Sequence, residues 1–209
     1  MTINGRDCVV LELRDITVTV DREQHLSDIS ARFEPGNFNV LLGPTLAGKT
    51  TLLRVMAGLD QPSAGQISWG DTDLTGVPVS KRSVAFVYQQ FINYPSLTVY
   101  DNIASPLRMA GVSKSDTKKR VEKIADLLAI GPMLKRKPLE LSGGQQQRVA
   151  VARALVTEPS IILADEPTGN LDSKNADRVL ELLENLNSEG STICMVTHDP
   201  RSAEIARRN

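Results

Sequence analysis

Short apolar runs that end in polar or turn residues recur along this chain. Residues 9–18 and 38–43 are rich in β-branched and aliphatic side chains, which predicts two strands. Further short apolar runs occupy 84–89, 160–166 and 191–198. The last two end in polar residues, as is typical of parallel strands that carry functional groups at their carboxyl ends.

Helical periodicity separates these runs. It predicts helices over residues 49–59, 115–130 and 143–157, and an amphipathic helix over 173–190. Residues 91–102 mix aromatic side chains with a proline, so we expect an irregular surface segment there. The alternation of strands and helices predicts an α/β fold.

Composition narrows the classes of protein. A chain of 209 residues with 41% apolar content can bury one good-sized core, with room for a smaller subdomain. The formal charge of −1 gives no reason to expect nucleic acid as the main partner. Cys8 and Cys194 are too few for a disulfide framework or a zinc site, and the N-terminus lacks the pattern of a secretory signal. We therefore expect a reducing, cytoplasmic setting.

Residues 43–50, GPTLAGKT, match the phosphate-loop pattern G-x-x-x-x-G-K-[ST] between a predicted strand and a predicted helix. Two glycines let the backbone bend around a β-phosphate, so that N–H groups point inward. A glycine-rich turn before a helix is the alternative. The predicted phosphate-binding residues are Gly43, Pro44, Thr45, Leu46, Ala47, Gly48, Lys49, Thr50 and Thr51.

Within this loop three residues have distinct expected roles. Lys49 adds a positive charge toward the β- and γ-phosphates, and Thr51 reaches the α-phosphate side. Thr50 offers its hydroxyl to Mg²⁺. The motif thus predicts a nucleoside triphosphate with Mg²⁺.

Two adjacent carboxylates, Asp165 and Glu166, end the apolar run at 160–166. Unpaired burial would be costly for both, so they need a cation or a reaction. We expect Asp165 to hold Mg²⁺ through water and Glu166 to orient or deprotonate the attacking water. A solvated acidic pair is the alternative.

Residues 141–145, LSGGQ, open the helix predicted over 143–157. Ser142, Gly143 and Gly144 would expose N–H groups at its start, which makes a second anion site. LSGGQ resembles the signature of the ATP-binding-cassette ATPases, and the resemblance spans almost the whole chain. It implies a P-loop NTPase (RecA-like) α/β core with a mainly parallel sheet, an N-terminal antiparallel β subdomain and an inserted helical subdomain at about 89–157.

The resemblance also implies roles for single residues and a dimer. In the family, the signature, here Ser142 to Gln145, faces the nucleotide of a second ATPase subunit arranged head to tail. Gln89 is similar to the glutamine that senses Mg²⁺ and water. Asp172, in NLD, is similar to a residue that crosses the dimer interface, and His198 to the switch histidine that contacts the γ-phosphate; a mere strand-end residue is the alternative for His198.

One departure concerns the nucleobase. Many relatives place an aromatic residue where this chain has Val20, and no aromatic lies nearby. Stacking on a nucleic-acid base contributes roughly 1–3 kcal/mol. We therefore expect a weaker base contact and looser discrimination among nucleoside triphosphates. His25 matches no motif, and a surface or strand position is expected for it.

The two parts of the chain resemble different transporters. Residues 41–60 and 87–108 resemble the ATPases of carbohydrate, polyol and glycerol-phosphate importers. Residues 163–173 and 196–204 are more similar to those of lipoprotein-release and macrolide-export systems. The resemblance implies an ATPase subunit on the inner face of the membrane, with import as the first expectation and export as the alternative. Transmembrane permease subunits would dock near Gln89–Pro106.

A soluble mechanical ATPase acting on DNA or ribosomes is the other class considered. Chromosome-type cassettes split the site with a long coiled coil, whereas only about fifty residues without heptads join Gln89 to Ser142. Translation-type cassettes usually carry two such units in one chain. Both features argue against this class.

Overall fold

The computed structural model describes residues 9–90, 92–169 and 173–198. Its contacts divide the chain into two units. The first comprises residues 1–86, 159–166 and 183–209, and the second residues 87–158 and 167–182. Each unit is described by itself.

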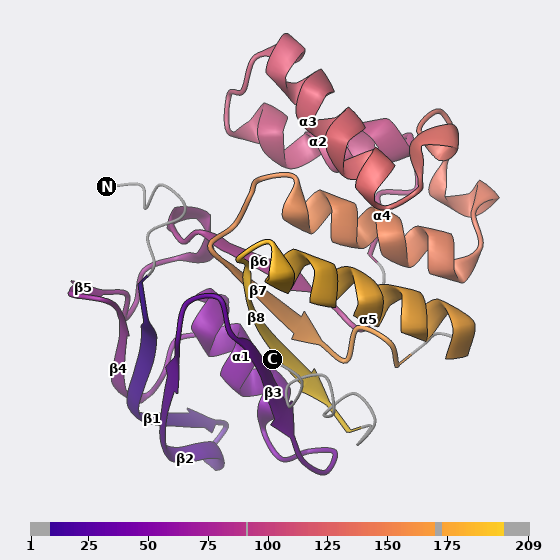
Figure 1. Cartoon of the computed structure of the whole chain (residues 1–209). Helices are drawn as coiled ribbons and strands as arrows, with labels where there is room; N and C mark the ends of the chain where they lie inside the picture. The colour runs from indigo at the N-terminus through magenta and orange to yellow at the C-terminus, as the bar shows by residue number, and fades with distance from the viewer. Residues whose placement is uncertain (1–8, 91, 170–172, 199–209) are drawn as a thin grey trace. The chain divides into compact units, whose positions relative to one another are not determined.

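An antiparallel sheet occupies the N-terminal part of the first unit (Figure 1). Its strands are β1 (Leu11–Val20), β2 (Glu23–Phe33), β4 (Ala64–Trp69) and β5 (Thr72–Asp73), in the order β2-β1-β4-β5. The turn residues Asp21 and Arg22 both have positive φ, 48° and 72°, which closes the β1–β2 hairpin tightly. The predicted antiparallel β subdomain is confirmed.

A second sheet contains β3 (Phe38–Leu42), β8 (Thr192–Thr197), β7 (Ile161–Asp165) and β6 (Val84–Val87), in the order β3-β8-β7-β6. Both β3 and β7 pair with β8 in parallel. Every residue of β7 and β8 is buried, which explains their continuous apolar runs. As predicted, the carboxyl ends of β3, β7 and β8 meet at one edge. The strand β6 ends two residues before the predicted limit at 89.

Helix α1 (Lys49–Ala57) buries one apolar face in this unit and ends at Gly58, whose φ is 75°. The buried side chains of α1 join those of β1, β2, β4, β7 and β8 in one core cluster. This packing fixes the start of α1 close to the edge where the parallel strands end. Helix α5 (Ser173–Ser188) connects β7 to β8 in sequence.

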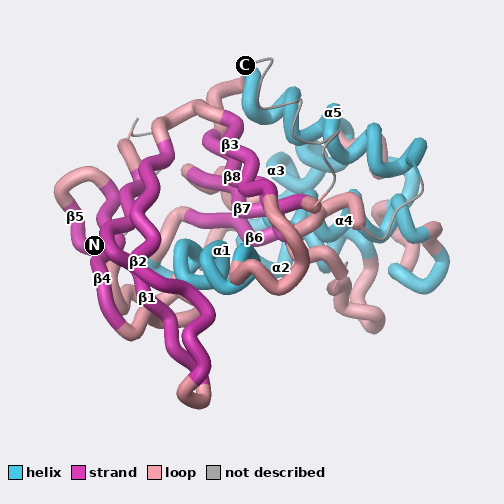
Figure 2. The backbone as a smooth tube through the Cα atoms, turned by 90° about the horizontal axis from the view of Figure 1, so that it is seen from below, coloured by secondary structure: helices cyan, strands magenta, loops and turns pink. Residues whose placement is uncertain are grey.

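The second unit is mostly helical (Figure 2). Its helices are α2 (Val99–Met109), α3 (Lys114–Leu127) and α4 (Gly143–Leu155), with short 3₁₀ turns at Gly131–Met133 and Pro138–Glu140. Helix α2 packs against both α3 and α4. No helix within the described part of the chain combines the length and the apolar character needed to cross a membrane.

The start of α2 corrects one prediction. Residues 91–102 were expected to be irregular, whereas α2 begins at Val99. The Thr98 hydroxyl accepts a hydrogen bond from the Asp101 N–H at 3.1 Å, which caps the helix. The spacing of Thr98 and Asp101 could have indicated this helix start. The nearby Pro95 favoured an irregular segment instead.

Candidate functional site

The glycine-rich loop joins β3 to α1 at the edge where the parallel strands end. Gly48 adopts φ 80° and Leu46 φ 68°, and Leu46 is 98% exposed. Among the described residues no side chain caps the start of α1, and its first turn holds no acidic residue. The first N–H groups of α1 are therefore available to an anion, which the helix dipole also favours.

The Lys49 side chain folds back onto the backbone of this loop. Its Nζ donates hydrogen bonds to the carbonyl oxygens of Gly43 at 2.8 Å and Pro44 at 2.7 Å. The ammonium is thus held by the segment that the sequence predicts to surround a phosphate. The carbonyl groups are neutral and do not cancel the charge of the ammonium group. An anion bound at the loop would therefore interact with the full positive charge of Lys49.

Thr50 and Asp165 form an oxygen pair beside the loop. The Thr50 hydroxyl donates a hydrogen bond to Asp165 Oδ1 at 3.0 Å, and Asp165 is only 8% exposed. Burial raises the pKa of the Asp165 carboxyl above its ordinary value, against the hydrogen bond from Thr50, and the charge of Glu166 adds to the rise. A hydroxyl and a carboxylate are the hard oxygen ligands that Mg²⁺ accepts.

These two oxygens do not make a complete cation cage. The described residues contain no group of three or more His, Cys, Asp or Glu side chains placed to share a metal ion. A Mg²⁺ ion that keeps several waters and binds substrate phosphates needs only one or two protein ligands. The residues present therefore fit a phosphate-bound Mg²⁺ and not a dedicated all-protein site.

Asp165→Asn is expected to stabilise the chain when no ligand is bound. Because the folded-state pKa is raised, ionised Asp165 lowers stability at neutral pH, and this cost disappears as the pH falls below the folded-state pKa. Thermal melts should show a Tm increase of about 2–4 °C at pH 7.5 that shrinks as the pH is lowered. A lower Tm for the variant at pH 7.5 would contradict this reading of the buried carboxyl.

Glu166 and His198 come together at the same edge. His198 Nδ1 lies 2.9 Å from Glu166 Oε1, and the Glu166 N–H donates to the Val196 carbonyl at 2.9 Å. The Glu166 side chain is 17% exposed and that of His198 is 57% exposed. Glu166 also adopts φ 44°, a left-handed conformation that is uncommon for glutamate. A partly shielded carboxylate with an imidazole beside it is suited to handling a proton.

Ser142 opens α4 in the second unit. Its hydroxyl accepts a hydrogen bond from the Gln145 N–H at 3.4 Å, and Gln145 Oε1 accepts one from the Ser142 N–H at 3.0 Å. This capping box defines the start of α4. Ser142 and Gly143 are exposed and Gly144 is buried. The helix start is thus ordered and partly open.

Gln89 lies two residues beyond β6, is exposed and belongs to the second unit. Asp172 and Phe91 lie outside the described residues. The first unit therefore brings together the residues of the glycine loop, the two carboxylates and His198, while Gln89 and the residues from Ser142 to Gln145 belong to the second.

The segment after Gln89 is held in place by hydrogen bonds that the sequence analysis did not predict. Asn102 is fully buried; its Oδ1 accepts a hydrogen bond from the Tyr94 N–H at 2.7 Å, and its Nδ2 donates to the Tyr94 carbonyl at 3.1 Å. The Tyr94 ring lies 5.0 Å from the Arg153 guanidinium of α4, and Tyr94 is 48% exposed. An asparagine within a helix gives no sequence signal for this role.

Comparisons with known sequences agree on one family. The ABC transporter family profile matches residues 26–169. The trehalose/maltose import ATP-binding protein MalK of Thermococcus litoralis is 45% identical over 179 residues, which cover 82% of this chain and 48% of that protein. The macrolide export ATP-binding/permease protein MacB of Marinobacter nauticus is 38% identical over 209 residues, covering 95% and 32%. The chain spans about half the length, or less, of these curated relatives.

Solved structures agree with the fold. A dimeric post-hydrolysis structure of the ATP-binding cassette MJ0796, bound to ADP and Pi, aligns with a TM-score of 0.84 and 33% identity. The alignment covers 93% of this chain and 90% of that one. A second dimeric structure of the same cassette gives a TM-score of 0.83 and 34% identity. The predicted α/β fold, with its parallel sheet, antiparallel sheet and helices, is therefore the fold of this ATP-binding cassette.

Proposed function

Since this chain belongs to the ABC transporter family, we propose that it is the ATP-hydrolysing subunit of a membrane transporter. The observation that carries the proposal is the meeting of three features at one sheet edge. These are the open helix start behind the glycine loop, the hydrogen-bonded Thr50–Asp165 pair and the Glu166–His198 pair. Together they offer an anion site, a cation site and a proton-handling site, which are the three parts that hydrolysis of a triphosphate requires.

The loop residues from Gly43 to Thr51 bind the phosphates in this proposal. Backbone N–H groups at the start of α1 surround the β-phosphate, and Lys49 exchanges its carbonyl partners for phosphate oxygens. Thr50 and Asp165 would hold Mg²⁺. When bound, Mg²⁺ neutralises charge on the β- and γ-phosphates. The 3.0 Å separation of the Thr50 and Asp165 oxygens supports this assignment for that pair.

Glu166 handles the attacking water. Its carboxylate accepts a proton from the water or orients it in line with the γ-phosphate, and His198 holds the carboxylate through the 2.9 Å contact. The exposed ring of His198 has room for a further contact to the γ-phosphate. Adjacent strands β7 and β8 deliver both residues, so their spacing is fixed by the sheet.

A second copy or a related subunit completes the site. We assign the start of α4, from Ser142 to Gln145, to the triphosphate bound by the opposite subunit in a head-to-tail dimer, with Asp172 crossing the interface. The exposure of Ser142 and Gly143 at the start of α4 supports this assignment. The dimeric state of the cassette MJ0796 is consistent with this arrangement.

The proposed partners of this ATPase are transmembrane permease subunits, which it would contact at the inner face of the membrane. The docking segment is Gln89–Pro106, where Tyr94 and Pro95 are exposed and Asn102 fixes the backbone of Tyr94. The 45% identity to a sugar-import ATPase favours import of a carbohydrate, polyol or glycerol-phosphate. The 38% identity to a macrolide-export protein over 95% of the chain supports an export or lipoprotein-release system as the second candidate.

Lys49→Ala tests the phosphate site directly. Removing a cation that makes charge-assisted hydrogen bonds is expected to weaken Mg²⁺–ATP binding by about 10- to 100-fold. Calorimetric titration of the purified chain measures this. Lys118→Ala, on an exposed helix surface, is the matched control and should bind as the wild type does. Equal binding by both variants would overturn the assignment of the loop.

The transport role has a separate test, which is to identify what copurifies with the chain. Copurification with nucleic acid or ribosomes instead of a membrane complex would overturn the transport assignment.

A further inference from the structure

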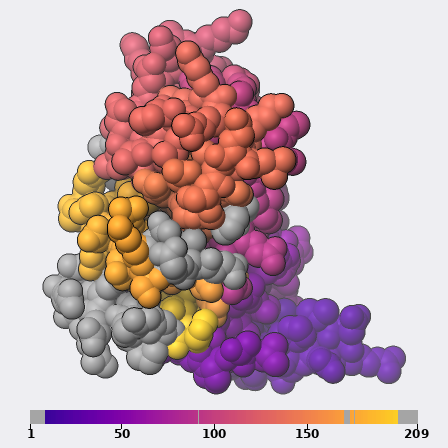
Figure 3. Space-filling model, turned by 90° about the vertical axis from the view of Figure 1, so that its right-hand side faces the viewer, coloured from indigo at the N-terminus to yellow at the C-terminus, as the bar shows by residue number. Residues whose placement is uncertain are grey.

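The buried face of α4 carries one polar side chain, that of Gln147. The other buried residues of this helix are glycine or apolar: Gly144, Val149, Val151, Ala152 and Leu155. Gln147 is 1% exposed, so it contributes almost nothing to the pink-to-orange surface of the second unit in Figure 3. Burying an amide costs free energy unless its polar atoms are paired. The reason for a glutamine at this position must therefore lie in the contact that its amide makes.

The Gln147 amide binds the backbone just beyond Glu166. Its Nε2 donates a hydrogen bond to the Pro167 carbonyl oxygen at 2.9 Å, and Pro167 is itself buried. Gln147 Oε1 is also buried, but it has no hydrogen-bond partner within the described part of the chain. An unsatisfied buried oxygen lowers stability. What this glutamine provides, and an apolar side chain could not, is the hydrogen bond to Pro167.

The backbone of Glu166 has a conformation that needs such support. Its φ is 44°, although the next residue is a proline, which favours an extended conformation at the residue before it. Strained conformations of this kind persist only where the surrounding structure holds them. On one side of Glu166, its N–H donates to the Val196 carbonyl at 2.9 Å. On the other side, the Pro167 carbonyl accepts the hydrogen bond from Gln147.

We propose that Gln147 is a positioning residue for ATP hydrolysis. Its amide holds the Pro167 carbonyl, and the peptide bond between Pro167 and Glu166 passes this restraint to the carboxylate that handles the attacking water. The inference rests on the proposed function, because it takes Glu166 to have that role. Gln147 itself contacts neither the nucleotide nor the water in this proposal.

A positioning role predicts that binding and turnover respond differently. The triphosphate is bound by residues 43–51, so the loss of the Gln147 amide should leave nucleotide affinity unchanged. The chemical step depends on the direction in which the Glu166 carboxylate points, and small displacements of a reacting group slow it strongly. The variant should therefore lower kcat and leave KM close to that of the wild type.

The experiment measures kcat and KM for Mg²⁺–ATP with the full chain carrying Gln147→Met, which keeps the size of the side chain and removes the donor. We expect kcat to fall by about tenfold, with KM and the calorimetric Kd within about twofold. Its Tm should stay within about 3 °C of the wild type, because the variant also removes the unsatisfied Oε1. Gln147→Asn keeps the amide but is one methylene too short for the contact, so it should show the same loss of kcat.

Asn187→Leu is the matched control, since it also removes a buried amide that donates to backbone carbonyls. Asn187 is 7% exposed and donates to Gly36 at 2.7 Å and to Ser191 at 2.9 Å. These carbonyls lie just before β3 and β8, so they are at the opposite ends of those strands from the proposed site. The control should lower Tm by at least about 4 °C and keep the wild-type kcat.

Three results would overturn the inference. They are a wild-type kcat in either Gln147 variant, a KM that rises as much as kcat falls, or an equal fall in kcat for Asn187→Leu, because turnover would then follow stability alone. Glu166→Gln separates the inference from the proposed function. If Glu166→Gln is inactive while both Gln147 variants turn over normally, the proposed function stands and the positioning role does not. If the wild-type chain fails to hydrolyse ATP, or Glu166→Gln hydrolyses it normally, the proposed function itself fails.

Discussion

Glu166→Gln is expected to lower steady-state ATP hydrolysis by about a thousandfold while leaving Mg²⁺–ATP binding within about twofold. Glutamine keeps the length of the side chain and can still contact His198, which lies 2.9 Å from the carboxylate. It cannot accept a proton from the attacking water. The variant should therefore load ATP and stop before the chemical step.

The same variant should accumulate an ATP-bound dimer, because hydrolysis is the step that reopens the two subunits in the proposed cycle. Phosphate release measures turnover, and size-exclusion chromatography with and without ATP measures the dimer. Glu181→Gln, at an exposed position of α5, is the control and should hydrolyse ATP normally. Undiminished hydrolysis by Glu166→Gln would rule out the assigned role.

The sequence predicted the edge of the parallel sheet well. The strands ending at Asp165 and Thr197 come from mainly apolar runs, and such runs are buried on both faces of a parallel sheet. Because parallel strands align their carboxyl ends, the residues that follow them had to meet. The contact between Glu166 and His198, 32 positions apart, follows from this rule although no local pattern encodes it.

A β-bulge in β2, where Val18 pairs with Leu26 but Thr19 pairs with Gln24, could not be predicted in the same way. Whether His25 or Gln24 is the extra residue depends on pairing with β1, and the alternation of side chains within β2 does not reveal it. The close approach of Gly48 to His25 is a contact between a strand and a loop that are more than twenty positions apart. Such contacts arise from tertiary packing, which is why His25 matched no motif.

The buried position of Arg82 could not be predicted from the sequence either. It follows a polar stretch, where an arginine is usually solvated. Here it is 8% exposed and donates to the carbonyl oxygens of Val55 and Met56, at 3.1 and 2.7 Å, at the end of α1. It also donates to the carbonyls of Val77 at 2.8 Å and Leu74 at 2.7 Å. Arg82 thus ties the end of the phosphate-binding helix to residues 74–77.

Arg82→Lys is expected to lower the free energy of unfolding by about 3 kcal/mol, even though the charge is kept. The guanidinium of Arg82 donates to four carbonyl oxygens from several nitrogen atoms held in one plane. A single ammonium group cannot reach all four, so some buried carbonyl oxygens lose their donors in the lysine variant. Gly58 leaves little room to adjust, because a β-carbon there would lie 2.5 Å from Arg82 Nε.

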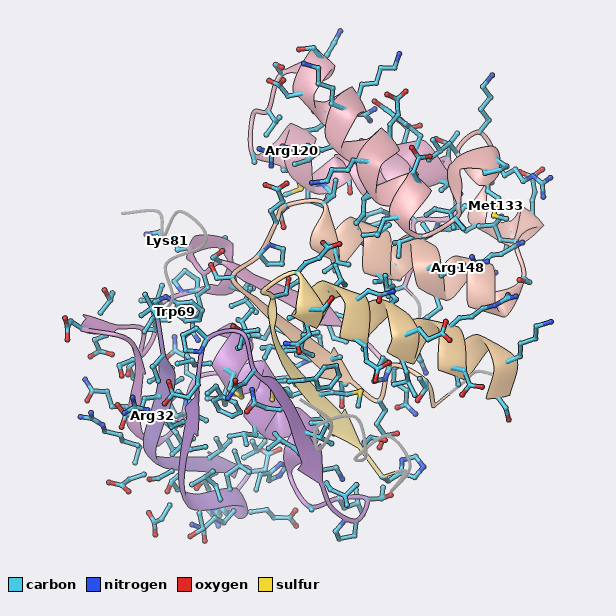
Figure 4. All side chains as sticks on the ribbon, viewed as in Figure 1. Arg32, Trp69, Lys81, Arg120, Met133 and Arg148 are labelled. Atoms are coloured by element: carbon cyan, nitrogen blue, oxygen red, sulfur yellow. The ribbon has the colours of Figure 1, made fainter. Side chains whose placement is uncertain are left out.

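Urea titration followed by circular dichroism measures the loss for Arg82→Lys, and Arg32→Lys is the matched control. Arg32, labelled in Figure 4, is 61% exposed and pairs with Glu34 at 2.6 Å on the surface of β2. Exposed ion pairs contribute little, so this variant should stay within about 0.5 kcal/mol of the wild type. Equal stability of the two variants would mean that water replaces the guanidinium, and that Arg82 does not hold the end of α1.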